Sequence, residues 1–137
     1  MNYLLIGDSH CHFIGMRKTE WTQCAFPGIT SGRFNQEHPG PFNADVIVIS
    51  LGGNDERFPH PPSNTNEELL LLRKKLSTKK VIWFITRNSD TVRELQIKIA
   101  NEYSDLIIDS RNFEVDLDGV HLSPKGYVEV INVIEKL

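Results

Sequence analysis

Apolar residues along the chain are grouped in four short continuous runs, at positions 3–6, 45–51, 80–86 and 105–109. These runs are rich in Val and Ile and do not alternate with polar residues, which is typical of strands covered on both faces of a parallel sheet. A shorter strand is expected at 21–25. The pattern therefore predicts a mostly parallel sheet.

Segments between the runs carry apolar residues three or four positions apart, which is the spacing of helices that bury one face. Helices are expected at 67–76 and 89–103. Thr65 and Glu68 have the spacing of a capping box, which would start the first of these two helices.

Two more helices complete an alternation of strands and helices along the whole chain. One is expected from about Thr30, and the last begins with Ser123 as its N-cap and Pro124 in its first turn. The alternation predicts a three-layer α/β/α sandwich with right-handed crossovers, built as one domain over residues 1–137.

Polar segments follow the ends of the predicted strands or precede a predicted helix. They are 7–10, 27–31, 52–55 and 118–121. In open α/β sheets, ligands bind at the carboxyl ends of the strands. We therefore expect the four segments to meet at one crevice.

The residue types in these segments suit acyl transfer through a serine. Ser9 would be the nucleophile, His121 would take its proton, and Asp118 would orient the imidazole. The negative charge that develops on the substrate oxygen needs hydrogen-bond donors. The backbone N–H groups of Ser9 and Gly28 and the side-chain amide of Asn54 are the candidates.

The sequence resembles the SGNH hydrolases, also called GDSL-type esterases, over nearly its whole length. The resemblance rests on four ordered blocks, which are Gly7-Asp8-Ser9, Gly28, Gly53-Asn54-Asp55 and Asp118-x-x-His121. It implies a flavodoxin-like α/β/α sandwich, a serine nucleophile and esterase, lipase, thioesterase or carbohydrate deacetylase activity with no metal and no cofactor.

Two positions qualify this resemblance. His10 replaces the usual leucine, as in the GDSH form of SGNH domains attached to membrane O-acyltransferases and of some carbohydrate-modifying relatives, which disfavours a lipase. Gly32 competes with Gly28 for the second block. His10, Gly53 and His60 are expected to contact the substrate, and the shortness of the chain predicts a shallow, open site.

The function expected from these features is hydrolysis of a small or carbohydrate-borne O-acyl ester by Ser9. The alternatives are an O-acyltransferase that uses the same site and a binding module that keeps the fold without turnover. Structural roles are expected for Asp8, which would bond nearby backbone amides, and for Asp55, as a turn residue.

Two metal-dependent interpretations have little support in the sequence. His10, Cys11 and His12 could in principle bind zinc, but three near-consecutive residues rarely converge on one ion. Asp8-x-His10 and Gly53-Asn54 also resemble parts of a metallophosphoesterase signature. The chain lacks the histidine after Asn54 and the Gly-His-x-His pair of that class.

The composition of the chain limits the kinds of partner that it is expected to bind. Fifteen Lys and Arg against eighteen Asp and Glu give a net charge of −3 with no long run of either sign, which does not favour nucleic acid. The apolar start is too short for a signal core or a membrane span. Cys11 and Cys24 are expected as free thiols in a cytoplasmic protein, and the oligomeric state stays open.

Overall fold

The computed structural model describes all 137 residues as five strands, five α-helices and one short 3-10 helix. In chain order they are β1 (Tyr3–Gly7), α1 (Ser9–Arg17), β2 (Thr22–Ala25), α2 (Ser31–Glu37), β3 (Phe42–Ser50), α3 (Thr65–Lys74), β4 (Leu76–Ile85), α4 (Asp90–Glu102), β5 (Leu106–Asp109), η1 (Ser110–Asn112) and α5 (Pro124–Lys136).

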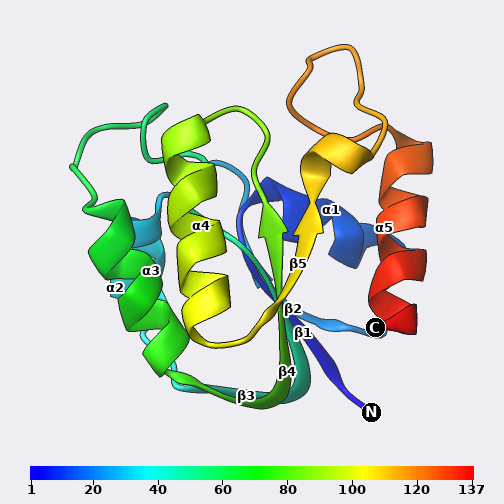
Figure 1. Ribbon diagram of the computed structural model, residues 1–137, viewed down its shortest axis with the longest axis horizontal. Coiled ribbons are helices and arrows are strands. Elements are labelled where there is room, and N and C mark those ends of the chain that lie inside the picture. Colours follow the sequence, from blue (N-terminus) through cyan, green and yellow to red (C-terminus); the bar gives the residue numbers. More distant parts are fainter.

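The five strands form one sheet in the order β2-β1-β3-β4-β5, and every neighbouring pair is parallel. Helices α1 and α5 cover one face of the sheet, and α2, α3 and α4 cover the other (Figure 1). The expected three-layer sandwich is confirmed, with a sheet that is parallel throughout. All strands therefore end at the same rim.

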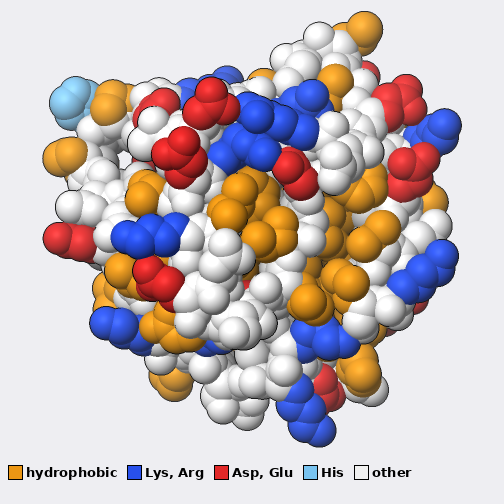
Figure 2. Space-filling view, in the orientation of Figure 1, with side chains coloured by type: hydrophobic (Ala, Val, Ile, Leu, Met, Phe, Trp, Pro, Cys, Tyr) orange, Lys and Arg blue, Asp and Glu red, His pale blue; other side chains and the backbone are white.

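The surface in the same orientation carries charged side chains of both signs, with acidic groups beside the basic ones (Figure 2). Two ion pairs lie near the rim where the strands end. Arg93 contacts Asp109 at 2.7 Å, and Arg111 contacts Asp90 at 2.7 Å. Together they tie the start of α4 to β5 and to η1.

Alternate residues of the strands pack into two separate apolar clusters. Leu5, Val48 and Ile82 point toward α1 and α5, whereas their neighbours Ile6 and Ile49 point toward α2, α3 and α4. This alternation explains the continuous apolar runs, because each strand buries both of its faces.

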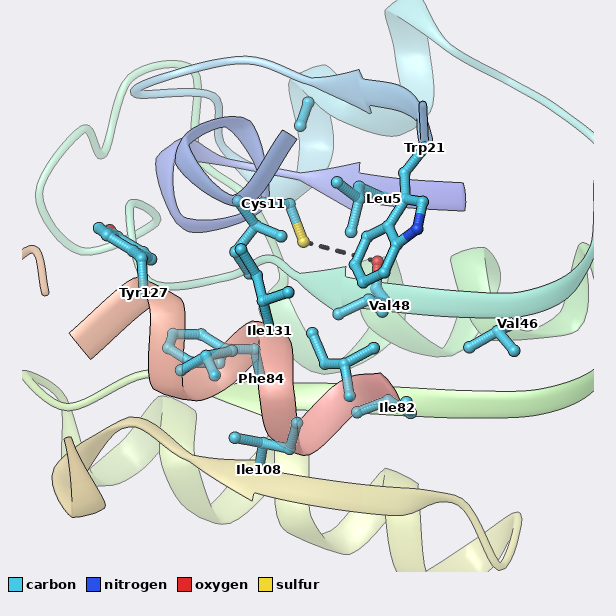
Figure 3. Packing of buried hydrophobic residues seen from close by; sticks show 14 of the residues in the cluster. Leu5, Cys11, Trp21, Val46, Val48, Ile82, Phe84, Ile108, Tyr127 and Ile131 are labelled. Atoms are coloured by element: carbon cyan, nitrogen blue, oxygen red, sulfur yellow. Dashed lines mark hydrogen bonds between the residues drawn. The ribbon is translucent and has the colours of Figure 1, made fainter. Parts of the chain in front are cut away.

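The cluster under α1 and α5 is drawn in Figure 3. The cluster includes Tyr127 and Ile131 of α5 and Phe84 of the sheet, and Trp21 lies near Leu5. A buried Cys11 thiol donates a hydrogen bond to the carbonyl of Val48 at 3.5 Å, and it forms no disulfide.

The start of α3 differs from the expectation. Asn64 is the N-cap, and its side chain accepts from the amide of Glu67, so the expected capping box of Thr65 and Glu68 is wrong. The hydroxyl of Thr65 donates instead to the buried carboxylate of Asp55 at 2.6 Å. The Thr65 hydroxyl, which the local spacing predicted as a helix cap, forms a tertiary hydrogen bond instead.

Two strands start earlier than the apolar runs suggest, at Phe42 for β3 and at Leu76 for β4. Leu76 was expected in the preceding helix, which ends at Lys74. The early part of β4 alternates between exposed and partly buried residues, and it pairs with the start of β3. A strand segment of this kind carries no continuous apolar run in the sequence.

β1 and β3 come close together where they end. Gly7 has a φ of 129°, and a Cβ atom added there would lie 1.8 Å from the carbonyl oxygen of Ser50. The next amide, of Asp8, donates to that same oxygen at 2.7 Å. Glycine is therefore required at the turn that leads into α1.

We expect Gly7→Ala to lower the free energy of unfolding by about 4 kcal/mol or more, or to prevent folding, because backbone must move to admit the methyl group. Gly119→Ala is the matched control, since Gly119 also has a positive φ of 67° but nothing lies within 4 Å of an added Cβ. It should cost only about 1 kcal/mol. Urea unfolding measures both, and equal losses would contradict the steric argument.

Candidate active site

Ser9 and His121 lie at opposite ends of the sequence and are joined by a hydrogen bond. The Ser9 hydroxyl is 2.9 Å from Nε2 of His121. Ser9 is the first residue of α1, directly after β1, and His121 lies in the loop before α5. The crossovers of the parallel sheet bring both to the rim where β1 ends.

Asp118 holds the other side of the His121 ring. Its Oδ2 atom is 2.7 Å from Nδ1 of His121, and its Oδ1 atom accepts from the backbone amides of Val120 and His121, both at 2.9 Å. These two backbone hydrogen bonds, followed by the one from the imidazole, lower the pKa of Asp118 to about 2.

The charge of Asp118 fixes the tautomer of the imidazole. An ionised carboxylate can only accept, so Nδ1 of His121 carries its proton toward Asp118. Nε2 is then the acceptor for the Ser9 hydroxyl. The three side chains are therefore arranged to remove a proton from a serine.

Candidate oxyanion donors lie beside Ser9. As the first residue of a helix, Ser9 has a backbone N–H with no partner within that helix. Asn54 donates from Nδ2 to the carbonyl of Ile29 at 3.2 Å, which holds its side chain against the loop after β2 and leaves its second N–H free.

The two competing glycines differ in what their amides do. The N–H of Gly32 lies within α2 and donates to the hydroxyl of Ser63 at 3.1 Å. The N–H of Gly28 donates no hydrogen bond within the protein, and the residue has a φ of 80°. Gly28 thus has the available amide, although it is not among the residues that line the main cavity.

Asp55 connects the loop of Gly28 to that of Asn54. It is buried and accepts from both the amide and the hydroxyl of Ser31, at 2.8 and 2.5 Å, and from the hydroxyl of Thr65. Asp55 lies in a turn, as expected, but its buried carboxylate has a further role as a tertiary hydrogen-bond acceptor that was not expected. No local spacing could reveal this role, because the partners lie 24 and 10 residues away along the chain.

Asp8 is a second buried acid at this rim. Its Oδ1 atom accepts from the hydroxyl of Ser50 at 2.8 Å and from the amide of His10 at 3.2 Å, and Ser50 in turn accepts from the amide of Cys11 at 3.1 Å. The expected bonding of Asp8 to a backbone amide is confirmed. Burial raises the pKa of Asp8 to about 6, against the lowering effect of these hydrogen bonds.

His10 is buried behind His121. Its Nδ1 atom is 3.2 Å from the hydroxyl of Tyr127, and its ring lies 4.9 Å from that of Phe84. Burial, followed by the nearby His121, lowers the pKa of His10 to about 3. His10 is therefore neutral over the range in which most proteins are stable.

A cavity of about 680 Å³ opens above these groups. Its lining residues are Asp8, Ser9, His10, Gly53, Asn54, Glu56, Arg57, Thr86, Asn88, Ser89, Asp118, Val120 and His121. Val120 is the single hydrophobic one. His10 and Gly53 were expected there, whereas His60 is exposed and lies outside the lining.

Several lining residues were not predicted from the sequence. Glu56, Arg57, Thr86, Asn88 and Ser89 belong to the loops after β3 and β4. The hydroxyl of Ser89 donates to Glu56 at 2.9 Å, which joins the two loops across the cavity. Their position directly after β3 and β4 could have predicted that they lie at the same rim as Ser9.

Comparison with solved structures gives several matches that cover most of this chain. A candidate acylhydrolase from Bacteroides fragilis has a TM-score of 0.69 at 14% identity, with 98% of this chain and 85% of that chain covered. The C-terminal catalytic domain of the Streptococcus pneumoniae peptidoglycan O-acetyltransferase has a TM-score of 0.62 at 17% identity, with 96% and 90% covered.

Two further structures extend this set. A carbohydrate acetylesterase family member from Sinorhizobium meliloti has a TM-score of 0.50 at 15% identity over 100% of both chains. A candidate lipolytic protein of the G-D-S-L family from Desulfitobacterium hafniense has a TM-score of 0.51 at 11% identity, with 90% and 85% covered. The chain has the SGNH-hydrolase fold. No family model and no curated protein matches the sequence.

The SGNH fold brings the four polar segments of the sequence to one rim. Segments 7–10, 52–55 and 118–121 contribute residues to the cavity wall, and segment 27–31 contacts Asn54 through Ile29. No helix has the length and apolar character that crossing a membrane requires. No group of three His, Cys, Asp or Glu side chains is placed to hold a metal ion.

We expect Asp8→Asn to change how stability depends on pH. The folded pKa of Asp8 is raised from 3.8 to about 6, so its contribution to stability is full below the lower value and is lost as the pH rises through the higher one. Asn keeps an acceptor for Ser50 and His10 without the charge. Relative to wild type, the free energy of unfolding of the variant should rise by up to about 3 kcal/mol between acid and mildly basic pH.

Urea unfolding of both proteins at several pH values measures this gain. A stability difference that stays constant from about pH 4 to pH 8 would show that Asp8 is not held in a protonation-sensitive state.

Proposed function

We propose that this chain is a serine esterase that removes a short acyl group, such as acetyl, from a carbohydrate hydroxyl. The observation that carries the proposal is the hydrogen-bonded series Ser9, His121 and Asp118 at the mouth of a polar cavity. The fold supports it, because a candidate acylhydrolase and a carbohydrate acetylesterase family member are among the structures that share it.

The reaction would proceed in two halves. As the Ser9 oxygen attacks the ester carbonyl carbon, its proton passes to Nε2 of His121. The oxyanion accepts hydrogen bonds from Ser9 N–H, Gly28 N–H and the Asn54 amide. His121 then returns the proton to the leaving alcohol oxygen, which leaves an acyl-serine.

Water completes the cycle. It gives a proton to Nε2 of His121 as its oxygen attacks the acyl carbon, and the second tetrahedral intermediate releases the carboxylic acid and restores the Ser9 hydroxyl. Asp118 stays ionised throughout and stabilises the imidazolium, and its pKa of about 2 suits that role.

The lining of the cavity supports a short acyl group on a polar alcohol. A long acyl chain needs an apolar channel, and Val120 is the one hydrophobic lining residue. Amide, hydroxyl and charged side chains such as Asn88, Ser89 and Arg57 fit a hydroxylated partner. Two of the structures with this fold are a carbohydrate acetylesterase family member and a peptidoglycan O-acetyltransferase domain.

We expect Ser9→Ala to reduce the rate of p-nitrophenyl acetate hydrolysis by at least about 10⁴-fold, because the acyl-serine cannot form. A fluorophosphonate probe should label the wild type at Ser9 and leave the variant unlabelled. Ser77→Ala is the control, since Ser77 is exposed on β4, away from the cavity. Equal rates for wild type and Ser9→Ala would remove Ser9 from the mechanism.

We expect Asn54→Ala to lower kcat by about 100-fold or more with a smaller effect on KM, because an oxyanion donor acts in the transition state. Asn54 also bonds to Ile29, so thermal unfolding of the variant must accompany the kinetics. A change confined to KM would assign Asn54 to substrate binding instead.

Acyl transfer to a second carbohydrate is the other candidate function. One observation favours it, which is the likeness to the O-acetyltransferase domain. The acyl-serine would then pass its acyl group to a sugar hydroxyl in place of water. Product analysis with and without sugar acceptors separates the two, because transfer yields a new ester whereas hydrolysis yields only free acid.

A further inference from the structure

A second cavity shares His121 and Asp118 with the main one. Its volume is about 270 Å³. The other residues that line it are Phe13, Arg17, Asp116, Leu122, Pro124 and Tyr127. Nothing in the proposed reaction so far uses any of these six.

One face of α1 leads from the nucleophile into this second cavity. Ser9, Phe13 and Arg17 are spaced four residues apart, so they lie in a row along the helix. The ring of Phe13 is half-buried and meets the His121 imidazole edge-on, with centroids 5.2 Å apart and an interplanar angle of 86°. It also lies 5.9 Å from the ring of Tyr127.

Besides these aromatic rings, the second cavity is lined by a donor, Arg17, and an acceptor, Asp116, that both have free hydrogen-bonding capacity. The Cζ atom of Arg17 lies 5.3 Å from the centroid of the Tyr127 ring. The guanidinium donates only one hydrogen bond within the protein, from Nη1 to the carbonyl of Phe13 at 3.3 Å. Asp116 accepts at Oδ1 from the amide of Leu117 at 2.9 Å, and its Oδ2 has no partner.

Arg17 and Asp116 line the same cavity without forming an ion pair with each other. A sugar hydroxyl both donates and accepts, so it can bridge a guanidinium and a carboxylate. The apolar face of a sugar ring can pack on an aromatic surface. A neutral carbohydrate unit matches this combination better than an anion or an acyl chain.

We propose that the second cavity binds the sugar unit next to the one that carries the acyl group. The inference rests on the proposed function. The leaving oxygen must reach Nε2 of His121 to receive its proton, so the body of the alcohol lies beside His121, where the two cavities meet. The preferred substrate is then an acylated oligosaccharide or polysaccharide, with Arg17 and Asp116 as specificity-determining residues.

The test compares kcat/KM for acetylated oligosaccharides and for the corresponding acetylated monosaccharides in the xylose, glucose and N-acetylglucosamine series. Wild type should prefer the oligosaccharide by about tenfold or more in at least one series. Arg17→Met and Asp116→Asn should each reduce that preference several-fold. Arg33→Met is the matched control, because Arg33 is on α2 and pairs with Glu37 away from both cavities, and it should keep the preference.

The outcomes separate this inference from the proposed function. If wild type hydrolyses p-nitrophenyl acetate through Ser9 but treats monosaccharide and oligosaccharide esters alike in all three series, the second cavity is not a sugar subsite. A preference that survives in both variants also overturns the inference. If wild type hydrolyses no ester, the proposed function itself fails. Thermal unfolding of each variant shows whether a lost preference comes from misfolding.

Discussion

The contact between the ends of β1 and β3 determines where everything else in the site lies. Gly7 brings the two backbones so close that no side chain fits between Gly7 and Ser50, and the amide of Asp8 then bonds to the Ser50 carbonyl. The chain then turns directly from β1 into α1. Ser9 therefore starts that helix at the rim, with the Asp8 carboxylate packed underneath and bonded to the hydroxyl of Ser50.

Two aspartates on either side of Ser9 show how environment sets the behaviour of one residue type. Asp8 is buried, and the loss of water raises its pKa. Asp118 is exposed, and two backbone amides with the imidazole lower its pKa. Asp118 stays ionised well into the acid range and contacts Nδ1 of His121 at 2.7 Å, so it holds the imidazole directly. Asp8 acts through its hydrogen bonds, which fix the turn before Ser9.

The architecture could be predicted from the sequence because its signals are local. Strands buried on both faces give continuous apolar runs, and N-caps such as Thr30, Ser89 and Ser123 mark helix starts. The predicted neighbours Ser9, His121 and Asp118 followed from the rule that parallel strands end at one rim. That rule places loops but does not orient side chains.

What could not be predicted depends on contacts between distant segments. Thr65 was expected to cap its own helix, but its hydroxyl donates to Asp55, a turn residue whose tertiary role was not expected. The polar start of β4 is a strand because β3 lies beside it. His60 is close to Asn54 along the chain but remains outside the cavity. For Thr65, Asp55 and the start of β4, the deciding partner lies in another segment of the chain.

The loop that carries the base has a consequence for how the site can fail. Asp118 and His121 are three residues apart in one tight turn, which is closed by a bond from the Asp116 amide to the His121 carbonyl at 2.9 Å. The acid and the imidazole are therefore held on one loop, whereas the nucleophile lies at the start of α1. The 2.9 Å contact between the Ser9 hydroxyl and Nε2 of His121 is the one bond that links these two parts, so a shift of the turn would break it while Asp118 and His121 stayed paired.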